Sequence, residues 1–360
     1  SAASFANVYG VAPGFWAFAP DPTTPEPEWG DQGVVVNQTL AARLGVKAGD
    51  RISIRLQPRN EVPHHFTYAP ESLAPRTVGA TVRAVLPASA FGHFDLRGRT
   101  SSDPAVFFPL DPLSRVINAA GRANTLLVAQ PRGRGELGAF AVRQALDEVY
   151  RLEDAELRLE APPDSGFYQL ETSRLYLNLS IEAATMGAVP TAYRVLTYPL
   201  EGVAKRDSED AAGRLLVTAT DRPDLTGDVR EGEVVLSAPL AEALNAGRGA
   251  LLDLKFLAPL RGRAGQELST TTMVSNILAE DSPLLDPYLV PPELAMAEAT
   301  DGQRPRHPLR AVVPLRFGQR LWGNRHHAVS AIRFPSERIR LDDLRTWIER
   351  ELSARTLGVT

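Results

Sequence analysis

The chain has 360 residues, of which 44% are hydrophobic and 23% charged, with a formal net charge of −4 and no cysteine. This is the composition of a folded protein with room for two or three domains. The small negative charge argues against general electrostatic binding to nucleic acid. The lack of cysteine excludes disulfides, thiolate metal sites and cysteine nucleophiles.

No run of about 18 apolar residues occurs, so no segment is expected to span a membrane, and no signal peptide is recognisable. The chain starts in a strand-like segment, residues 1–16, and stops just after a helix, at 354–360. Both ends look cut rather than capped. We therefore expect a domain excised from a longer polypeptide, and a mature protein with short termini is the alternative.

The first half is expected to contain short strands and a few helices. Apolar alternation and apolar runs predict strands at 6–11, 34–36, 52–56, 77–86, 105–110, 125–130 and 155–161. Helical spacing predicts helices at 38–44, 112–119 and 136–151. Asn37 is placed to cap the first helix, because its side chain can accept hydrogen bonds from the first turn, and Gly45 is placed to end it.

The second half is expected to follow a mostly apolar helical stretch, residues 164–187, which Gly187 and Pro190 end. Strands are predicted at 192–200, 214–219, 268–278, 309–315 and 328–334. An apolar strand followed by a proline and a helix is predicted at 286–298. A closing helix is predicted at 342–354, with Asp342 as its cap and acidic residues in its first turn.

One segment occurs twice without a gap. Residues 34–57 read VVVNQTLAARLGVKAGDRISIRLQ, and residues 234–257 read VVLSAPLAEALNAGRGALLDLKFL. The identical residues are Val34/Val234, Val35/Val235, Leu40/Leu240, Ala41/Ala241, Leu44/Leu244 and Gly49/Gly249. A duplicated strand–helix–strand unit predicts two related halves, and the differing polar positions argue against a catalytic site on it.

The correspondence extends beyond this segment. Three further segments of the second half match the first half: 268–278 matches 77–86, 286–298 matches 105–117, and 342–354 matches 136–151. We expect a first half at 1–162, a helical junction at 163–190 and a second, diverged half at 191–360. Strands and helices are interleaved without strict alternation, which predicts an α+β fold class with two related mixed α/β subdomains.

The sequence shows no pattern of catalytic or metal-binding residues. The motifs HExxH, GxSxG and Walker A are absent, and no GxGxxG opens a helix directly after a strand. Adjacent histidines point in different directions from a strand or a helix and so make a poor bidentate metal site. The histidines are His64, His65, His93, His307, His326 and His327. We therefore predict no catalytic, cofactor-binding or metal-binding residue, although a composite metal site of distant histidines stays open.

Other chemically notable residues are interpreted as structural. Scattered acidic side chains are expected on a solvated surface, and they include Asp253, Glu280, Asp281 and Asp286. Phe15, Trp16 and Trp322 are expected in the core rather than on a ligand platform. Long polar excursions at 57–76, 91–103 and 203–212 are the expected contact surfaces, because loops on rigid scaffolds commonly carry binding.

The chain resembles the large extracytoplasmic domain of MacB/FtsX-type ABC transporter permeases. In that family an apolar strand is frequently followed by Asn, two residues, Leu-Ala, two residues, Leu-Gly, three residues and Gly-Asp, as at 34–50 here. The matching segments are 8–18, 34–56, 77–86 and 106–113, with 171–185 and 312–334 resembling the version that has a longer, duplicated ectodomain.

The resemblance implies a periplasmic-core-like domain on the extracytoplasmic side of the cell membrane. Such a domain would contact a substrate or an envelope partner, such as a lipoprotein, and transmit ATP-driven motion without being an enzyme. Its implied partners are its own transmembrane helices and a separate nucleotide-binding ATPase subunit, with no cofactor and no nucleic acid. The chain ends, near Ala3 and Thr360, should then lie close together.

The second copy departs from the family pattern. Ser237, Gly249 and Ala250 stand where the first copy has Asn37, Gly49 and Asp50, so a role tied to that turn belongs to the first half. The same turn occurs in double-psi β-barrels, and a cofactor-binding barrel of an oxidoreductase is the alternative. That alternative predicts six tightly wound strands in about 90 residues. The long helix expected at 136–151 does not fit such a barrel well. A hydrolase with composite histidine and acidic residues is a third hypothesis.

Overall fold

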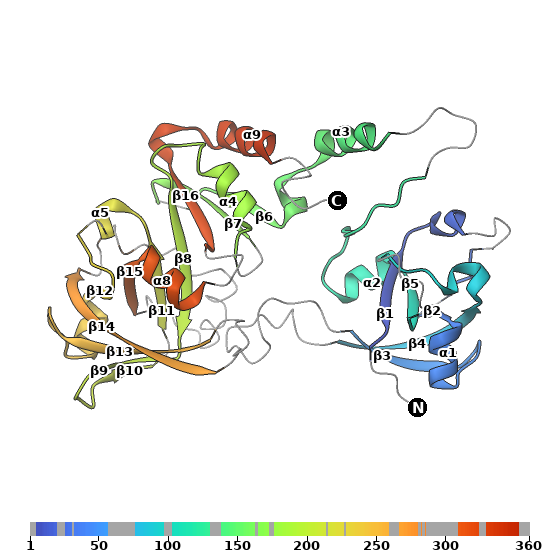
Figure 1. The fold of residues 1–360 in the computed structure, drawn as a ribbon, viewed down its shortest axis with the longest axis horizontal. Helices are drawn as coiled ribbons and strands as arrows, with labels where there is room; N and C mark the ends of the chain where they lie inside the picture. The colour runs from blue at the N-terminus through green and yellow to red at the C-terminus, as the bar shows by residue number, and fades with distance from the viewer. Residues whose placement is uncertain are drawn as a thin grey trace. The chain divides into compact units, whose positions relative to one another are not determined.

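The computed structural model describes residues 5–19, 26–30, 32–56, 76–96, 103–129, 138–162, 165–172, 176–213, 215–226, 228–258, 266–279, 282, 285, 309–323 and 329–352. The chain forms two compact units (Figure 1). Ser1–Asn60 and Glu71–Glu136 belong to the first unit, and Leu137–Thr360 belong to the second.

The first unit is built on a five-stranded mixed sheet with the strand order β1-β5-β2-β4-β3 among its described residues. Two of its pairings are parallel, β1 with β5 and β2 with β4, and the others are antiparallel. Its strands are β1 (Asn7–Val11), β2 (Gly33–Asn37), β3 (Arg51–Leu56), β4 (Arg76–Leu86) and β5 (Ala105–Pro109).

Two hydrophobic layers cover the faces of this sheet. Val34 and Val36 share a buried cluster with residues of the helices α1 (Gln38–Leu44) and α2 (Leu110–Val116). Val35 belongs to a second buried cluster, which is rich in aromatic rings from η1 (Phe15–Phe18) and η3 (Ala88–Gly92). Successive residues of a strand point to opposite faces, so the continuous apolar run of β2 fills both layers. Phe15 and Trp16 lie in this core, as predicted.

The second unit is built on an eleven-stranded sheet with the order β10-β9-β13-β14-β12-β15-β11-β8-β16-β7-β6 among its described residues. Its strands are β6 (Leu157–Glu160), β7 (Phe167–Thr172), β8 (Tyr193–Leu200), β9 (Gly202–Lys205), β10 (Ala211–Ala212), β11 (Leu215–Thr220), β12 (Glu233–Ser237), β13 (Leu251–Leu257), β14 (Glu267–Leu278), β15 (Arg310–Pro314) and β16 (Ala331–Pro335). Its helices are α3 (Ala139–Val149), η4 (Leu152–Ala155), α4 (Leu179–Thr185), α5 (Pro223–Thr226), α6 (Ala238–Ala243), α8 (Leu315–Trp322), η7 (Ser336–Arg338) and α9 (Leu341–Glu351).

The core of the second unit has two main parts. Trp322 is fully buried and stacks on Tyr198 with 5.4 Å between the ring centroids, which agrees with its predicted place in the core. A separate apolar cluster joins α4 and α9 to β6, β7 and β16. The fold is of the predicted α+β type, with a mixed sheet and several helices in each unit. No helix among the described residues is both long and apolar enough to cross a membrane.

Five strands of the second sheet repeat the order and directions of the first sheet. β11-β15-β12-β14-β13 corresponds to β1-β5-β2-β4-β3, with the same alternation of parallel and antiparallel pairs. The register shifts between Val34 and Val35 in one sheet and between Val234 and Val235 in the other. The amide of Gly49 donates to the carbonyl of Val82 (2.8 Å), and that of Gly249 donates to Val274 (2.7 Å).

This pairing corrects one predicted correspondence. The partner of β5 is β15 at 310–314, since both pair antiparallel to the repeated strand and both end at a proline followed by a helix. The sequence pattern predicts 286–298 at that place, and this segment lies outside the described residues. The prediction was wrong because both 286–298 and 309–322 read as an apolar segment with a proline before a helix, and the strand pairing that distinguishes them is not visible in the local sequence.

The junction at 163–190 is also different from its prediction. The stretch expected to be helical contains β7, which pairs with β6 and β16, before α4 begins. Aromatic and β-branched residues in FYQLET favour a strand, and neighbouring strands on both sides satisfy its backbone. β6 and β7 belong to the second sheet, so the compact units divide at residues 136 and 137, not at the expected boundary near 162.

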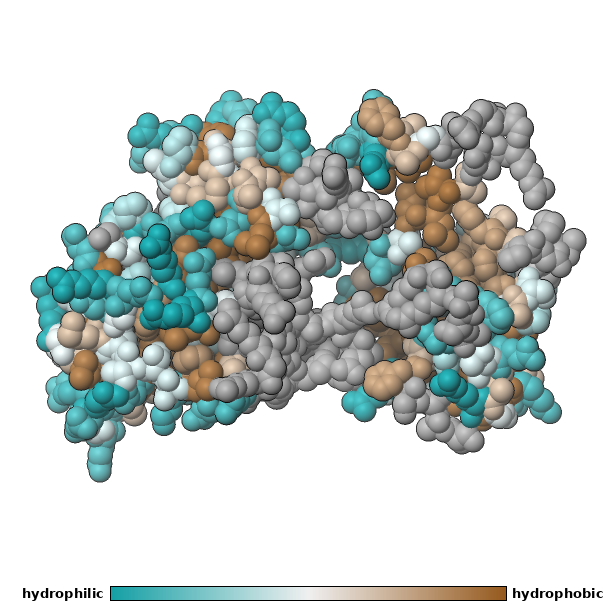
Figure 2. Space-filling model, in the orientation of Figure 1, coloured by the Kyte–Doolittle hydropathy of each residue, from teal (hydrophilic) through white to brown (hydrophobic). Residues whose placement is uncertain are grey.

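The predicted strand at 125–130 is another difference. The described part, 125–129, has no regular structure and its residues are exposed, including Leu126 at 67% and Val128 at 49%. Figure 2 shows hydrophobic surface in this region of the first unit. Elsewhere, Arg340 rather than Asp342 is the N-cap of α9, although Asp342 does lie in its first turn.

Candidate functional site

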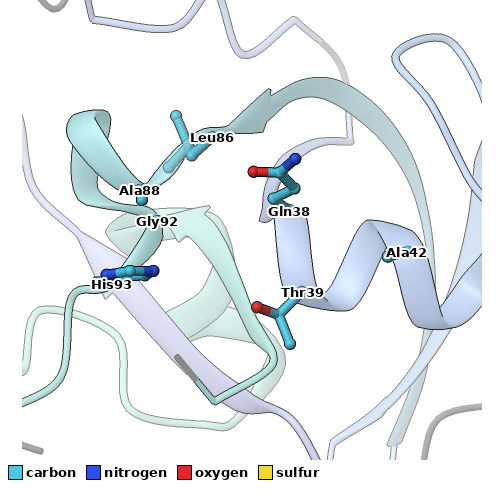
Figure 3. Close-up of a pocket in the computed structure, with 7 residues that line it drawn as sticks. All are labelled: Gln38, Thr39, Ala42, Leu86, Ala88, Gly92 and His93. Atoms are coloured by element: carbon cyan, nitrogen blue, oxygen red, sulfur yellow. The ribbon is translucent and has the colours of Figure 1, made fainter. Parts of the chain in front are cut away.

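The first unit has a pocket of about 240 Å³ between the start of α1 and the turn that follows β4. Gln38, Thr39 and Ala42 line it from α1. Figure 3 shows these residues facing the loop that carries Ala88, Gly92 and His93, with Leu86 at the end of β4. Leu86 and Gly92 are buried, whereas Gln38, Ala42 and His93 are exposed. The pocket is therefore open to solvent above a partly apolar floor.

Asn37 fixes both walls of this pocket. The side chain is 1% exposed, and its Oδ1 accepts hydrogen bonds from the amides of Leu40 (2.9 Å) and Ala105 (3.0 Å). Its Nδ2 donates to the carbonyls of Gly92 (3.0 Å) and Asp103 (2.8 Å). A carboxamide has two acceptor sites and two donors, so all four are used. One residue thus ties α1, β5 and the turn after β4 together.

The turn itself is held in an uncommon conformation. Phe91 has a φ of 61°, which costs a bulky residue on the order of 1–3 kcal/mol. Its ring is buried and stacks on Phe15 with 4.6 Å between centroids. A Cβ on Gly92 would lie 2.5 Å from the carbonyl oxygen of Pro87, so only glycine fits there. The strained turn persists because ring stacking and the Asn37 bond hold it, and strained backbone of this kind is often found at ligand sites.

The corresponding place in the second unit is built differently. Ser237 ends β12, and its Oγ accepts a hydrogen bond from the amide of Arg310 (3.2 Å), as Asn37 does from Ala105. The buried Arg310 guanidinium donates to the carbonyl of Leu285. Leu285 lies as far beyond the end of β14 as His93 lies beyond the end of β4, and it packs in an apolar cluster with Val235 and Val312. The Leu285 carbonyl thus accepts a hydrogen bond as the Gly92 carbonyl does in the first unit, and the Leu285 side chain is buried against Val235 as Phe91 is against Val35.

The described lining of the pocket carries no recognisable catalytic machinery. Its lining side chains offer the carboxamide of Gln38, the hydroxyl of Thr39 and the imidazole of His93, with no carboxylate, ammonium or guanidinium. Within the part of the chain that the structure describes, no group of three histidine, cysteine or acidic side chains could hold a metal ion. The histidines other than His93 lie outside the described residues.

Shifted pKa values are found in the second unit, where they mark structural contacts. The hydrogen bond from Arg345 (2.8 Å) lowers the pKa of Glu153. The hydrogen bond from Thr271 (2.6 Å) and the Arg206 guanidinium lower the pKa of Asp253. Asp253 is thus an ion-paired surface residue, while Glu280, Asp281 and Asp286 lie outside the described residues.

The sequence predicted no site residue, and the pocket was missed. Asn37 was predicted only as a helix cap, which is confirmed by its bond to Leu40. Its two donor bonds join residues 55 and 66 positions away, and no local pattern reveals such contacts. The excursion at 91–103 was an expected contact surface, and its first residues do line the pocket. The excursion at 203–212 instead contributes β9 and β10 to the sheet, and 57–75 lies outside the described residues.

The sheet of the first unit also bears on the alternative fold. A double-psi barrel has six wound strands, whereas the described residues of this unit form five strands in a linear order that ends at β1 and β3. Among the described residues, the edge strand β1 pairs only with β5 and the edge strand β3 pairs only with β4, so the sheet is open and not closed into a barrel. The first unit, as described, is not that barrel.

No protein-family model matches the chain, and no curated protein matches it. One solved structure that does match is the crystal structure of the periplasmic region of MacB from Actinobacillus actinomycetemcomitans. It is 9% identical, with coverage of 52% of this chain and 77% of that chain, at a TM-score of 0.33. At this TM-score the likeness carries no argument about function.

Proposed function

We propose that this chain is an extracytoplasmic domain of a MacB/FtsX-type ABC transporter permease. In this role it contacts a substrate or an envelope partner and transmits the ATP-driven motion of membrane helices. It performs no chemistry itself, because hydrolysis takes place in a separate nucleotide-binding subunit. The observation that carries the proposal is the way the segment at 34–50 is used in the fold.

Each residue of the family pattern in that segment has a distinct structural task. Asn37 caps α1 and bridges to β5, and Leu40 and Ala41 are buried. Gly45 ends the helix with a φ of 68°, and Gly49 turns the chain with a φ of 96°. Such positive φ angles favour glycine. The pattern is therefore used as a whole, which supports the resemblance better than a chance match of scattered letters.

The repeated strand order supports a duplicated ectodomain. We infer that β1–β5 and β11–β15 descend from one unit, because order, strand directions and the position of the register shift agree. The two units have diverged around Asn37 and Ser237. The two units share the strand order of their sheets but differ in the hydrogen bonds around Asn37 and Ser237. This difference is expected if the first unit keeps a contact with a partner and the second unit has lost it.

Purification of the natural gene product that contains this chain tests the proposal. Membranes are solubilised in a mild detergent, and the affinity-tagged protein is purified and assayed for ATP hydrolysis. We expect a nucleotide-binding subunit to co-purify and to hydrolyse ATP, while residues 1–360 alone do not. A gene product that is recovered without any ATPase subunit would contradict the proposal.

A further inference from the structure

We propose that the pocket lined by Gln38, Thr39, Leu86 and His93 binds an uncharged, hydrogen-bonding segment of a partner polypeptide. The inference rests on the proposed function in one respect only, which is that the partner polypeptide lies on the extracytoplasmic side of the membrane. It names the chemistry of the contact: a peptide unit or a side-chain carboxamide, with a small apolar group beside it.

The charge of the lining selects against ionic ligands. No side chain in the lining carries a permanent charge. A carboxylate or an ammonium group entering the pocket would lose part of its hydration without gaining a counter-ion, which is unfavourable. A neutral amide loses less hydration. This argument favours a peptide unit over a phosphate, a free amino acid or a charged lipid headgroup.

The polar groups of the lining match those of an amide. Gln38 offers a carbonyl oxygen and an NH₂ group, and the His93 imidazole offers two ring nitrogens for hydrogen bonding. A peptide unit has one donor and one acceptor. Figure 3 shows the two residues on opposite walls, from α1 and from the loop after β4. The buried Leu86 and the exposed Ala88 give the lining apolar surface against which a methyl or methylene group can pack.

The volume indicates a segment rather than a whole small molecule. Pockets for drug-sized ligands measure roughly 300–1,000 Å³, and this one measures about 240 Å³. It holds one or two residues of a chain whose remainder lies outside. Such an anchor is typical of a protein contact, in which a few buried groups supply most of the affinity.

The walls are formed before any ligand arrives. Asn37 donates hydrogen bonds to the carbonyls of Gly92 in the loop and of Asp103 just before β5, and Phe91 stacks on Phe15. A preorganised site spends less of its binding free energy on ordering. In the second unit Ser237 and Arg310 take over the contacts of Asn37, and the following loop packs the buried Leu285 against Val235 and Val312, so the binding is assigned to the first unit alone.

Nuclear magnetic resonance with small probes tests the inference on the whole 360-residue chain. N-acetylalanine methylamide serves as the neutral peptide probe, and acetate and methylammonium serve as charged probes at equal ionic strength. We expect the amide probe to shift the signals of the Gln38 side chain, Thr39, Gly92 and His93 in a saturable way, with half-saturation on the order of 10 mM. We expect the charged probes to leave those signals in place.

Two matched variants separate pocket binding from a general effect. Ala88→Trp places an indole in the pocket, and Ala48→Trp places one on an exposed turn of the same unit. We expect Ala88→Trp to weaken the amide response at least tenfold and Ala48→Trp to leave it unchanged. Acetate or methylammonium shifting the same signals more strongly than the amide would overturn the inference. So would a response that survives in Ala88→Trp, or no response to the amide probe at about 50 mM, a concentration at which a ligand of this size should saturate much of the site.

The two proposals fail separately. A failed ATPase co-purification removes the permease assignment and leaves the probe response as it stands. A missing probe response removes the peptide site and leaves the permease assignment intact.

Discussion

Asn37 and Ser237 occupy the same position in the two units, each at the end of the repeated strand and just before a helix. Each accepts a hydrogen bond from the first residue of the neighbouring strand, Ala105 at 3.0 Å and Arg310 at 3.2 Å. Asn37 also donates hydrogen bonds from its Nδ2 to the carbonyls of Gly92 and Asp103. In the second unit the Arg310 side chain donates to the carbonyl of Leu285 instead, so the donor has moved from one strand to the next.

Replacing Asn37 by Ala should destabilise the first unit strongly. The change leaves the amides of Leu40 and Ala105 and the carbonyls of Gly92 and Asp103 without their side-chain partner. Loss of such buried partners costs about 1–3 kcal/mol each when water cannot replace them, so we expect a loss of at least about 3 kcal/mol. Urea unfolding followed through the tryptophans of this unit measures it.

Asn37→Ser is the matched control for that experiment. Serine keeps an acceptor for Ala105, as Ser237 does in the second unit, but its single hydroxyl donor cannot replace both hydrogen bonds of the Asn37 Nδ2. We expect a smaller loss than for Asn37→Ala. Equal losses for the two variants would mean that the acceptor bonds contribute nothing, against the geometry described here.

Arg310→Ala and Ser237→Asn test whether the two arrangements are interchangeable. Arg310→Ala alone should destabilise the second unit by about 2–4 kcal/mol, because the Leu285 carbonyl loses a charged donor. Adding Ser237→Asn supplies a carboxamide in the second unit, at the position that corresponds to Asn37 in the first. We expect the double variant to recover at least about 1 kcal/mol relative to additivity in a double-mutant cycle. Strict additivity would argue against structural equivalence of the two sites.

Gly92→Ala should disrupt the turn that forms one wall of the pocket. The new Cβ would lie 2.5 Å from the oxygen of Pro87 and 2.7 Å from its carbonyl carbon, and these backbone atoms cannot move aside cheaply. We expect a loss of about 1–3 kcal/mol, the range for overpacked sites, together with loss of the probe response. Gly79→Ala in β4 is the control, because nothing lies within 4 Å of its added Cβ. Equal thermal stability of the two variants would show that the turn has another conformation.

Tyr198 should make the second unit lose stability at alkaline pH. Burial raises the pKa of Tyr198 above its ordinary value of about 10, because the ionised phenolate would be desolvated. In the unfolded chain the phenol ionises near pH 10. The stability that comes from burying the neutral Tyr198 side chain is therefore intact below pH 10 and is lost as the pH rises above it. The decline approaches about 1.4 kcal/mol per pH unit for this group.

Tyr198→Phe is the variant that isolates this effect. It removes the hydroxyl that donates to the Leu257 carbonyl (2.7 Å) and should lower stability at pH 7 by about 1–3 kcal/mol. We expect its stability to fall less steeply than that of the wild type between pH 10 and 11. Parallel pH profiles for the two proteins would place the alkaline loss elsewhere.

Local patterns predicted the elements that are stabilised locally. The helix at 38–44 was predicted with both ends correct, because a capping Asn and a terminal Gly act within a few residues. The similarity of 34–57 and 234–257 predicted a strand, a helix and a strand in each segment, and the structure has these elements in both. By contrast, β7 took its conformation from β6 and β16, strands that lie before and far after it in the chain.

The pocket could not be predicted for the same reason. Its walls come from α1 and from a turn about 50 residues later, and their spacing depends on Asn37 bonds of long sequence separation. Phe91 with a positive φ is unexpected from its residue type. The apolar run at 125–129 satisfied the strand pattern, but a strand also needs an adjacent edge with which to pair, and the pattern does not contain that edge.

Surface labelling of intact cells tests the central claim most directly. The chain has no cysteine, so Ala48→Cys on an exposed turn and Ala80→Cys in the core provide single thiols at an accessible and a buried position. Both are placed in the natural gene product and treated with a membrane-impermeant maleimide, with the unsubstituted product as background. An extracytoplasmic domain predicts that Ala48→Cys is labelled in cells whose inner membrane is intact and that Ala80→Cys is labelled only after denaturation. Labelling of Ala48→Cys only after the inner membrane is broken would contradict the account.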